Sequence, residues 1–281
     1  MSNDREEVIV NKLLNSSAAC NVNFDASQHP QLRDFLRAEW DRALQGMECL
    51  ETDQWFDRLI SQHNQVGRHY HTSVHLKEML DYLNILEEGA AISDQQHKAI
   101  LRLAVFFHDA VYDPQSSTNE KDSANLFEQF TREVGRKILG ASTVDTVITC
   151  ILATQRHKVI PGEVTMLQEF FLDIDMAVLG KKMHAYRSYA ALIRKEYHFV
   201  PHAIYCEKRA EILESFLNGK QIYLTTVMSC ALEKNARQNL RDEIESLKQG
   251  KIPNDDETQL SVWYESFLKE FSSIELKAYS S

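Results

Sequence analysis

The chain has 281 residues, of which 43% are hydrophobic and 26% charged, a composition typical of a globular protein with a sizeable core. Its formal net charge of -10 disfavours broad binding to nucleic acid or to an anionic membrane, although it allows a local pocket for a small phosphorylated ligand. With only 9 glycines and 5 prolines, the chain has few residues for the tight turns of an all-β fold, so long helices are expected.

Apolar residues recur at helical spacing along most of the chain and predict a multi-helix, all-α fold. Residues 1–29 lack this periodicity and are expected to form a loosely ordered leader, so that one helical domain covers 30–281. The predicted helices lie, in chain order, at 31–40, around 55–60, at 72–88, 94–107, 120–138, 144–154, 163–179, 183–197, 201–217, 222–249 (one or two helices) and 259–271.

Targeting and redox features favour a cytoplasmic protein without a membrane partner. The N-terminus has no basic segment leading into an apolar core, and the longest apolar run, 103–107, is too short to cross a bilayer. The five cysteines are scattered and form no C-x-x-C pair, which favours reduced thiols over disulfides or a thiolate zinc site. The sequence leaves the oligomeric state open, a homo-oligomer included.

His108 and Asp109 directly follow the apolar run 103–107, which is expected to be buried. A carboxylate at the edge of a core is costly unless it is paired or bound to a cation, and imidazole with carboxylate suits a divalent transition metal. A helix C-terminus at which polar residues simply resume explains the pair equally well. From these two residues alone, both interpretations stay open.

His71 and His75 stand four residues apart near the start of the helix predicted from Thr72 or Ser73, so their rings share one face. A zinc-peptidase motif would need a glutamate directly after the first histidine, and Thr72 stands there instead. Taken alone, a histidine on an apolar helix face such as His75 is more often a core residue than a ligand.

Asp173 and Asp175 lie within an otherwise apolar stretch, 170–179. One capping or ion-paired aspartate and one exposed aspartate would account for them without any function. A metal ligand or a base is the favoured interpretation for at least one of the two, because both carboxylates fall inside a segment that is expected to be buried.

Together, the order His75, His108-Asp109 and Asp175 on separate predicted helices resembles the HD superfamily of metal-dependent phosphohydrolases, and within it a group of uncharacterised predicted phosphohydrolases. The strings that carry the resemblance, spread over about 65–215, are Tyr70-His-Thr-Ser-Val-His75, Phe106-Phe-His-Asp-Ala-Val-Tyr-Asp113, Asn119-Glu120 with Ser123-Ala124, Leu172-Asp-Ile-Asp175 and Ile193-Arg-Lys-Glu-Tyr197.

The resemblance implies an HD-type helical bundle with a metal site between core helices. Its ligands would be His75, His108, Asp109 and Asp175, with Asp109 also touching the attacking water. Asp175 is chosen over Asp173 because Met-Ala-Val-Leu follows it, as in the family's pattern. The cofactor would be a divalent ion, with Mn, Fe, Co, Ni, Zn and Mg all compatible.

The implied activity is hydrolysis of a nucleotide, or of another small phosphorylated metabolite, by a metal-activated water. Glu120 is the candidate general acid/base or water-orienting group, although a first-turn acid favoured by the helix dipole explains it nearly as well. His157 would neutralise phosphate, protonate a leaving group or join a second metal, or it is simply a polar residue at a helix end.

Several side chains are candidates for binding the substrate. The basic ones are Arg68, Arg156, Lys158, Arg194 and Arg209, and those expected to line the pocket or support it are His71, Tyr112 and Asp113. Arg194 and Arg209 are favoured among the cations because Tyr197 and Tyr205 stand near them in the sequence.

Two other functions remain compatible with these residues. The first is a non-catalytic, nucleotide-sensing or scaffolding helical protein that keeps the metal site, although such a protein needs neither Glu120 nor His157. The second is a metal-dependent oxygenase on a related scaffold, which would need further ligands for a second iron, and only His157 is an obvious spare.

Overall fold

The computed structural model describes residues 3–15, 29–44, 49–134, 139–161 and 165–252. All regular secondary structure among these residues is helical, which confirms the predicted all-α class for the described part of the chain. The α-helices are α1 (Asn3–Asn15), α2 (Pro30–Leu44), α3 (Leu50–His63), α4 (Ser73–Glu88), α5 (Gln95–Phe107), α6 (Asn119–Val134), α7 (Ala141–Ala153), α8 (Thr165–Asp175), α9 (Met183–Glu196), α10 (His202–Leu217) and α11 (Thr226–Lys248), with a 3₁₀-helix η1 (Met176–Gly180) directly after α8.

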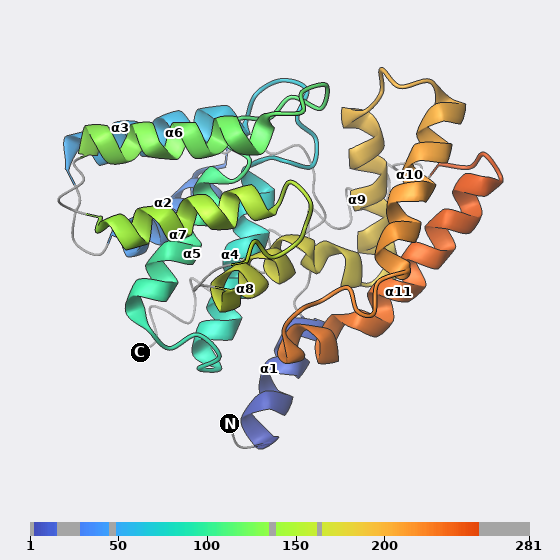
Figure 1. The fold of residues 1–281 in the computed structure, drawn as a ribbon, viewed down its shortest axis with the longest axis horizontal. Helices are drawn as coiled ribbons and strands as arrows, with labels where there is room; N and C mark the ends of the chain where they lie inside the picture. The colour runs from blue at the N-terminus through green and yellow to red at the C-terminus, as the bar shows by residue number, and fades with distance from the viewer. Residues whose placement is uncertain (1–2, 16–28, 45–48, 135–138, 162–164, 253–281) are drawn as a thin grey trace.

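The helices fall into two groups that flank α8 (Figure 1). On one side α5 packs against α2 and α7, and α6 packs against α3 and α7. On the other side α11 packs against α10, η1 and α1. Helix α4 connects the groups, because it contacts α2 and α5 on one side and α1 and α8 on the other.

The ends of α4 and α5 are fixed by local signals that place the first two histidines. The Thr72 side chain accepts a hydrogen bond from the Val74 amide (3.3 Å) and begins α4, which puts His75 in its first turn. The Asp94 carboxylate accepts one from the His97 amide (2.8 Å) and begins α5. Helix α5 then runs until His108, its C-terminal cap.

An aromatic cluster anchors the end of α5. The Phe107 ring is fully buried and packs against Trp40, Trp55, Phe127 and Phe130, with ring centroids 5.0–6.2 Å apart. Burying a ring of this size contributes about 2–3 kcal/mol. Residues from three other helices, α2, α3 and α6, therefore hold the backbone directly before His108.

Helix α8 changes to the tighter η1 directly after Asp175. The expected single helix over 163–179 is thus two elements, because η1 must lie close against α11. A Cβ atom at Gly180 would stand 2.5 Å from the Leu232 Cβ atom, so only glycine allows this approach.

The N-terminal segment differs from the expectation of a loosely ordered leader over 1–29. Residues 3–15 form α1, which packs against α4 and α11 with Ile9 and Leu13 buried. These two apolar residues, four positions apart, are the signal that a search for longer periodicity overlooks. The predicted helix at 259–271 lies outside the described residues, and no described helix meets the length and apolarity that a bilayer crossing requires.

Candidate metal centre

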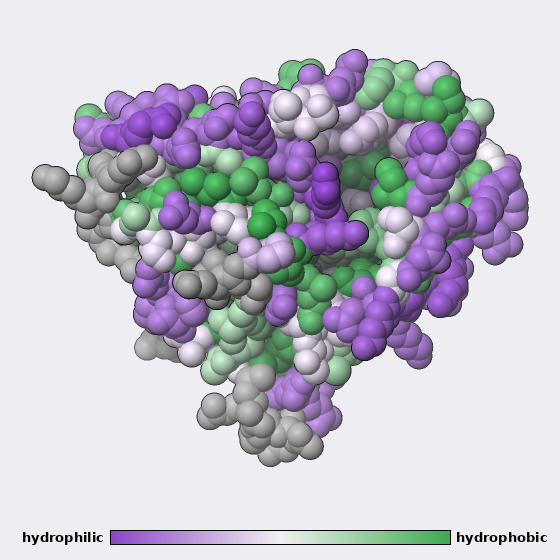
Figure 2. All heavy atoms as spheres, in the orientation of Figure 1, coloured by the Kyte–Doolittle hydropathy of each residue, from purple (hydrophilic) through white to green (hydrophobic). Residues whose placement is uncertain are grey.

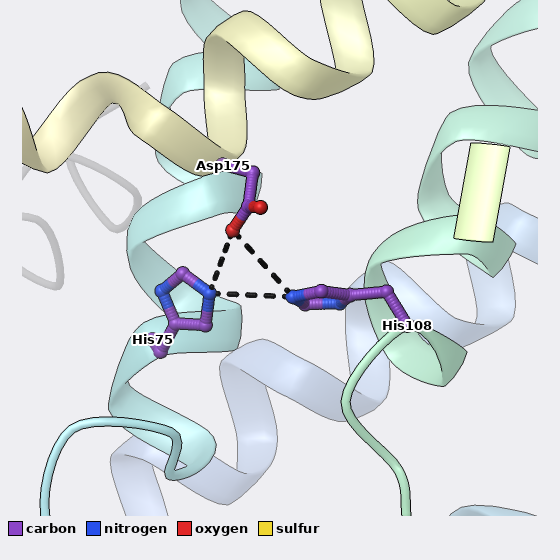
Figure 3. Close-up of side chains that lie close together, drawn as sticks. All are labelled: His75, His108 and Asp175. Carbon is purple, nitrogen blue, oxygen red and sulfur yellow. Dashed lines mark hydrogen bonds and ion pairs between the residues drawn. The ribbon is translucent and has the colours of Figure 1, made fainter. Parts of the chain in front are cut away.

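Three side chains from three helices converge on one buried point (Figure 3). The His75 Nε2 atom lies 3.2 Å from the Asp175 Oδ1 atom and 3.3 Å from the His108 Nε2 atom. The third side of the triangle, from His108 Nε2 to Asp175 Oδ1, measures 3.7 Å. Only 1–2% of each histidine side chain and 13% of the Asp175 side chain are exposed.

The backbone selects the tautomer of His108. Its Nδ1–H donates to the Val105 carbonyl oxygen (2.9 Å), which can only accept, so the Nε2 atom is left to point at the centre. Histidine ligands of metal ions are usually held in this way. The Nδ1 atom of His75 is buried and has no hydrogen-bond partner among the described residues.

Asp109 borders this group through His108. Its Oδ2 atom lies 3.1 Å from His108 Nε2, whereas the three atoms that lie within 4.8 Å of one another belong to His75, His108 and Asp175. The predicted four-residue ligand set is therefore brought to one place, with three members in a compact triangle and Asp109 beside it.

The field of the two carboxylates favours positive charge at this point. Burial lowers the pKa of His108, but Asp109 and Asp175 raise it by more, to about 9. Burial raises the pKa of Asp175, but hydrogen bonds with His157 and His75 and the charge of His108 lower it overall. Two imidazole nitrogens and a carboxylate oxygen, in a pocket that stabilises a cation, form a donor set that fits a divalent transition metal.

Asp173 is held in a different environment from Asp175. Its carboxylate accepts hydrogen bonds from the Leu224 amide, the Thr225 amide and the Thr225 hydroxyl, each 2.7 Å long. These contacts join α8 to the segment that begins α11. Asp173 is thus engaged in packing, and Asp175 is the aspartate that faces the histidines.

His157 approaches Asp175 from the turn after α7. Its Nε2 atom lies 3.4 Å from the Asp175 Oδ2 atom, the oxygen that does not face the triangle. The His157 backbone has φ of +47°, a left-handed conformation that is unfavourable for residues with a side chain. Backbone strain of this kind clusters at functional sites, so it supports a role for this imidazole.

Glu196 is a site residue to which the sequence assigned no role. Its Oε1 atom accepts the backbone amides of His69, Tyr70 and His71 at 2.8–3.0 Å. Its Oε2 atom accepts the Nδ1–H of His71 (2.7 Å) and the hydroxyl of Tyr112 (2.8 Å). The only signal was its place in the string Ile193-Arg-Lys-Glu-Tyr197, which carried the family resemblance.

A cavity of about 330 Å³ opens over the metal centre. Asp109, Asp175, His71, His157 and Glu120 line it, together with Tyr112. Seen from one face, the surface is hollowed between the two helix groups, where hydrophilic and hydrophobic residues lie side by side (Figure 2). The carboxylates of Asp109, Glu120 and Asp175, which were predicted as catalytic or metal-binding groups, therefore face the same cavity.

The start of α6 brings Glu120 to the cavity. The Asn119 side chain closes the preceding loop through Asp113: it accepts the Asp113 amide (3.0 Å) and donates to the Asp113 carbonyl oxygen (2.8 Å). Asp113 itself is exposed and supports the loop, not the cavity wall. Glu120, the next residue of α6, is half-buried.

The basic residues that were predicted to bind phosphate differ in whether they line the cavity. Arg68 donates to the carbonyl oxygens of Asp109 (2.6 Å) and Ala110 (3.0 Å), and Arg194 donates to those of Tyr197 and Val200 (both 2.9 Å). Neither lines the cavity, whereas Arg209 does. Arg156 and Lys158 are exposed outside it. The substrate-binding roles of these residues stay predictions.

Comparisons with protein-family models, with curated proteins and with solved structures find no match to this chain. The resemblance to the HD superfamily therefore stays a prediction.

Proposed function

We propose that the chain is a metal-dependent phosphohydrolase of the HD type that acts on a nucleotide or another small phosphorylated metabolite. The observation that supports this proposal is the convergence of His75 Nε2, His108 Nε2 and Asp175 Oδ1 on one point, with Asp175 also lining a cavity. The order of these residues along the chain is that of the family it resembles. An HD-type helical bundle is part of the same proposal.

In this proposal, His75, His108 and Asp175 hold a divalent ion, and Asp109 lies beside it. Such an ion supplies a nucleophilic hydroxide at neutral pH and offsets charge on the phosphoryl oxygens. The Asp109 carboxylate faces His108 and the cavity, so it is placed to accept a hydrogen bond from the attacking water. Burial of these groups strengthens each electrostatic contact.

Two further cavity residues would move protons. His157 lies 3.4 Å from Asp175 and faces the cavity, so it is placed to donate a proton to the leaving oxygen. Glu120 enters the same space from α6 and would accept a proton from water or orient it. His71 and Tyr112, both held by Glu196, would bind the substrate from the adjacent wall.

The proposal is tested with the full chain, loaded with Mn, Co or Mg and assayed for product release from a panel of phosphorylated nucleotides and sugars. We expect turnover with at least one compound, and a loss of about 100-fold or more in Asp175→Asn, since even indirect contacts to a metal are worth 10–100-fold. Asp173→Asn is the matched control, because it changes a neighbouring aspartate outside the triangle.

Metal binding without turnover of any compound would contradict the enzyme proposal and favour the non-catalytic, ligand-sensing alternative. Equal activity in Asp175→Asn and wild type would show that the triangle is not the active centre.

A further inference from the structure

The cavity over the metal centre is poor in positive charge. Among the described residues that line it, Arg209 is the only lysine or arginine, whereas Asp109, Asp175 and Glu120 all contribute carboxylates. A pocket that binds several phosphates normally surrounds them with arginine, lysine or backbone amides. The lining of this cavity has the opposite character, because its carboxylates outnumber its arginines and lysines.

Arg209 is also already engaged by an acid. Its Nε atom donates to the Glu243 Oε1 atom (3.0 Å), and a second guanidinium nitrogen lies 3.5 Å from the Oε2 atom. Glu243 is buried and also accepts the hydroxyl of Tyr186. The Glu243 carboxylate thus largely compensates the charge of Arg209, so a second phosphate would be attracted only weakly to this guanidinium.

The wall formed by α9 and α10 is aromatic and aliphatic. Its lining residues are Tyr189, Ile193, Tyr197, Ile212, Leu213 and Phe216. The Phe216 ring meets the His157 ring edge-on, with centroids 6.0 Å apart, so this apolar wall begins next to the metal centre. Aromatic rings of this kind bind flat, apolar groups by stacking or by edge contacts.

Ile212 extends the apolar wall toward solvent. It lines the cavity and is 52% exposed, so its aliphatic side chain is accessible to a bound ligand. The cavity volume, about 330 Å³, lies at the lower end of the range for small-molecule pockets.

We infer that the substrate is a phosphomonoester with a single phosphoryl group joined to an aromatic ring system, the chemistry of a nucleoside monophosphate, and that di- and triphosphates are disfavoured. The inference deepens the proposed function and rests on it. One divalent ion offsets the charge of one phosphate dianion. Each additional phosphate would be placed among carboxylates without a free lysine or arginine, among the described lining residues, to receive it.

The experiment compares matched compounds on the full chain loaded with Mn. The compounds are the mono-, di- and triphosphate of one nucleoside, with glycerol phosphate as a monoester that lacks a ring. Loss of each substrate is followed by chromatography, so that cleavage at any phosphate is detected. We expect kcat/KM for the monophosphate to exceed that of the triphosphate, and that of glycerol phosphate, by at least about tenfold.

Phe216→Ala tests the apolar wall. It should lower kcat/KM for the nucleoside monophosphate about tenfold more than it lowers kcat/KM for glycerol phosphate, because only the nucleoside reaches this ring. Phe199→Ala is the matched control, since Phe199 is a 41% exposed aromatic residue outside the cavity lining. A general loss of stability would affect both compounds equally.

Equal or faster turnover of the triphosphate would overturn the inference while leaving a phosphohydrolase in place. So would equal turnover of glycerol phosphate together with indifference to Phe216→Ala. Turnover of none of the four compounds, with other phosphomonoesters of the wider panel cleaved, would overturn the substrate class alone. Turnover of nothing in that panel would overturn the proposed function itself.

Discussion

The carboxylate of Glu196 accepts five hydrogen bonds, so Glu196→Gln changes one wall of the cavity at a single position with almost no change in size. The glutamine carbonyl oxygen still accepts the three backbone amides. Its NH₂ group, however, replaces the Oε2 atom, so the Nδ1–H of His71 and the hydroxyl of Tyr112 lose the carboxylate oxygen to which they donate. Two charge-assisted hydrogen bonds are lost, each worth about 1.5–3 kcal/mol.

The pKa of Glu196 gives an independent magnitude. Burial raises it, but the charge of His71 and the hydrogen bonds from His71 and the backbone lower it by more, from an ordinary value of 4.5 to about 2. This difference corresponds to about 3 kcal/mol. Because the pKa is depressed in the folded protein, the stabilisation is complete above about pH 4.5 and is lost as the pH falls toward 2.

Urea unfolding of the full chain from pH 7 down to pH 3 measures this contribution. We expect Glu196→Gln to be less stable than wild type by about 3 kcal/mol at pH 7, with the gap narrowing as the pH falls below about 4. Glu128→Gln is the control, because its exposed pair with Arg132 is worth less than about 1 kcal/mol. A gap that is absent at pH 7, or that stays constant down to pH 3, would refute the assigned role of Glu196.

Three further replacements test other parts of the structure. Asp173→Asn should lower the free energy of unfolding by about 2 kcal/mol without changing metal content, because the carboxylate accepts three hydrogen bonds at the start of α11. Urea unfolding and metal analysis of the same protein check this, and a loss of metal would contradict it. His157→Gly should unfold with a free energy about 1 kcal/mol higher than His157→Ala, since φ of +47° suits glycine; equal thermal melting curves would argue against the strained turn. Phe107→Ala should cost about 3–5 kcal/mol in chemical denaturation, as it empties the aromatic cluster before His108, and a cost below about 1 kcal/mol would mean that the cluster does not anchor α5.

The helical class was predictable because helical spacing is a local property. The apolar faces of α4 and α5, and the caps at Thr72 and Asp94, lie within a few residues of the positions that they determine. The division of α8 from η1 was not predictable in this way. It depends on the approach of Gly180 to Leu232, more than 50 residues further along the chain.

The candidate site was likewise predictable only in part. His75, His108 and Asp175 were found because the family resemblance supplied their order, and the structure brings them together. Glu196 was missed as a functional residue, since its backbone partners at 69–71 are about 125 residues away. The sequence also could not show that Arg68 and Arg194 donate to backbone carbonyl oxygens, because it does not distinguish such an arginine from one that lies on the surface.

The central claim, that His75, His108 and Asp175 together hold a divalent ion, is tested most directly by the metal content of the purified full chain. After dialysis against trace Mn, Fe, Co, Ni and Zn, wild type and Asp173→Asn should each retain about one ion per chain, and Asp175→Ala and His108→Ala should retain almost none. Equal metal content in all four proteins, or none in wild type, would contradict the account.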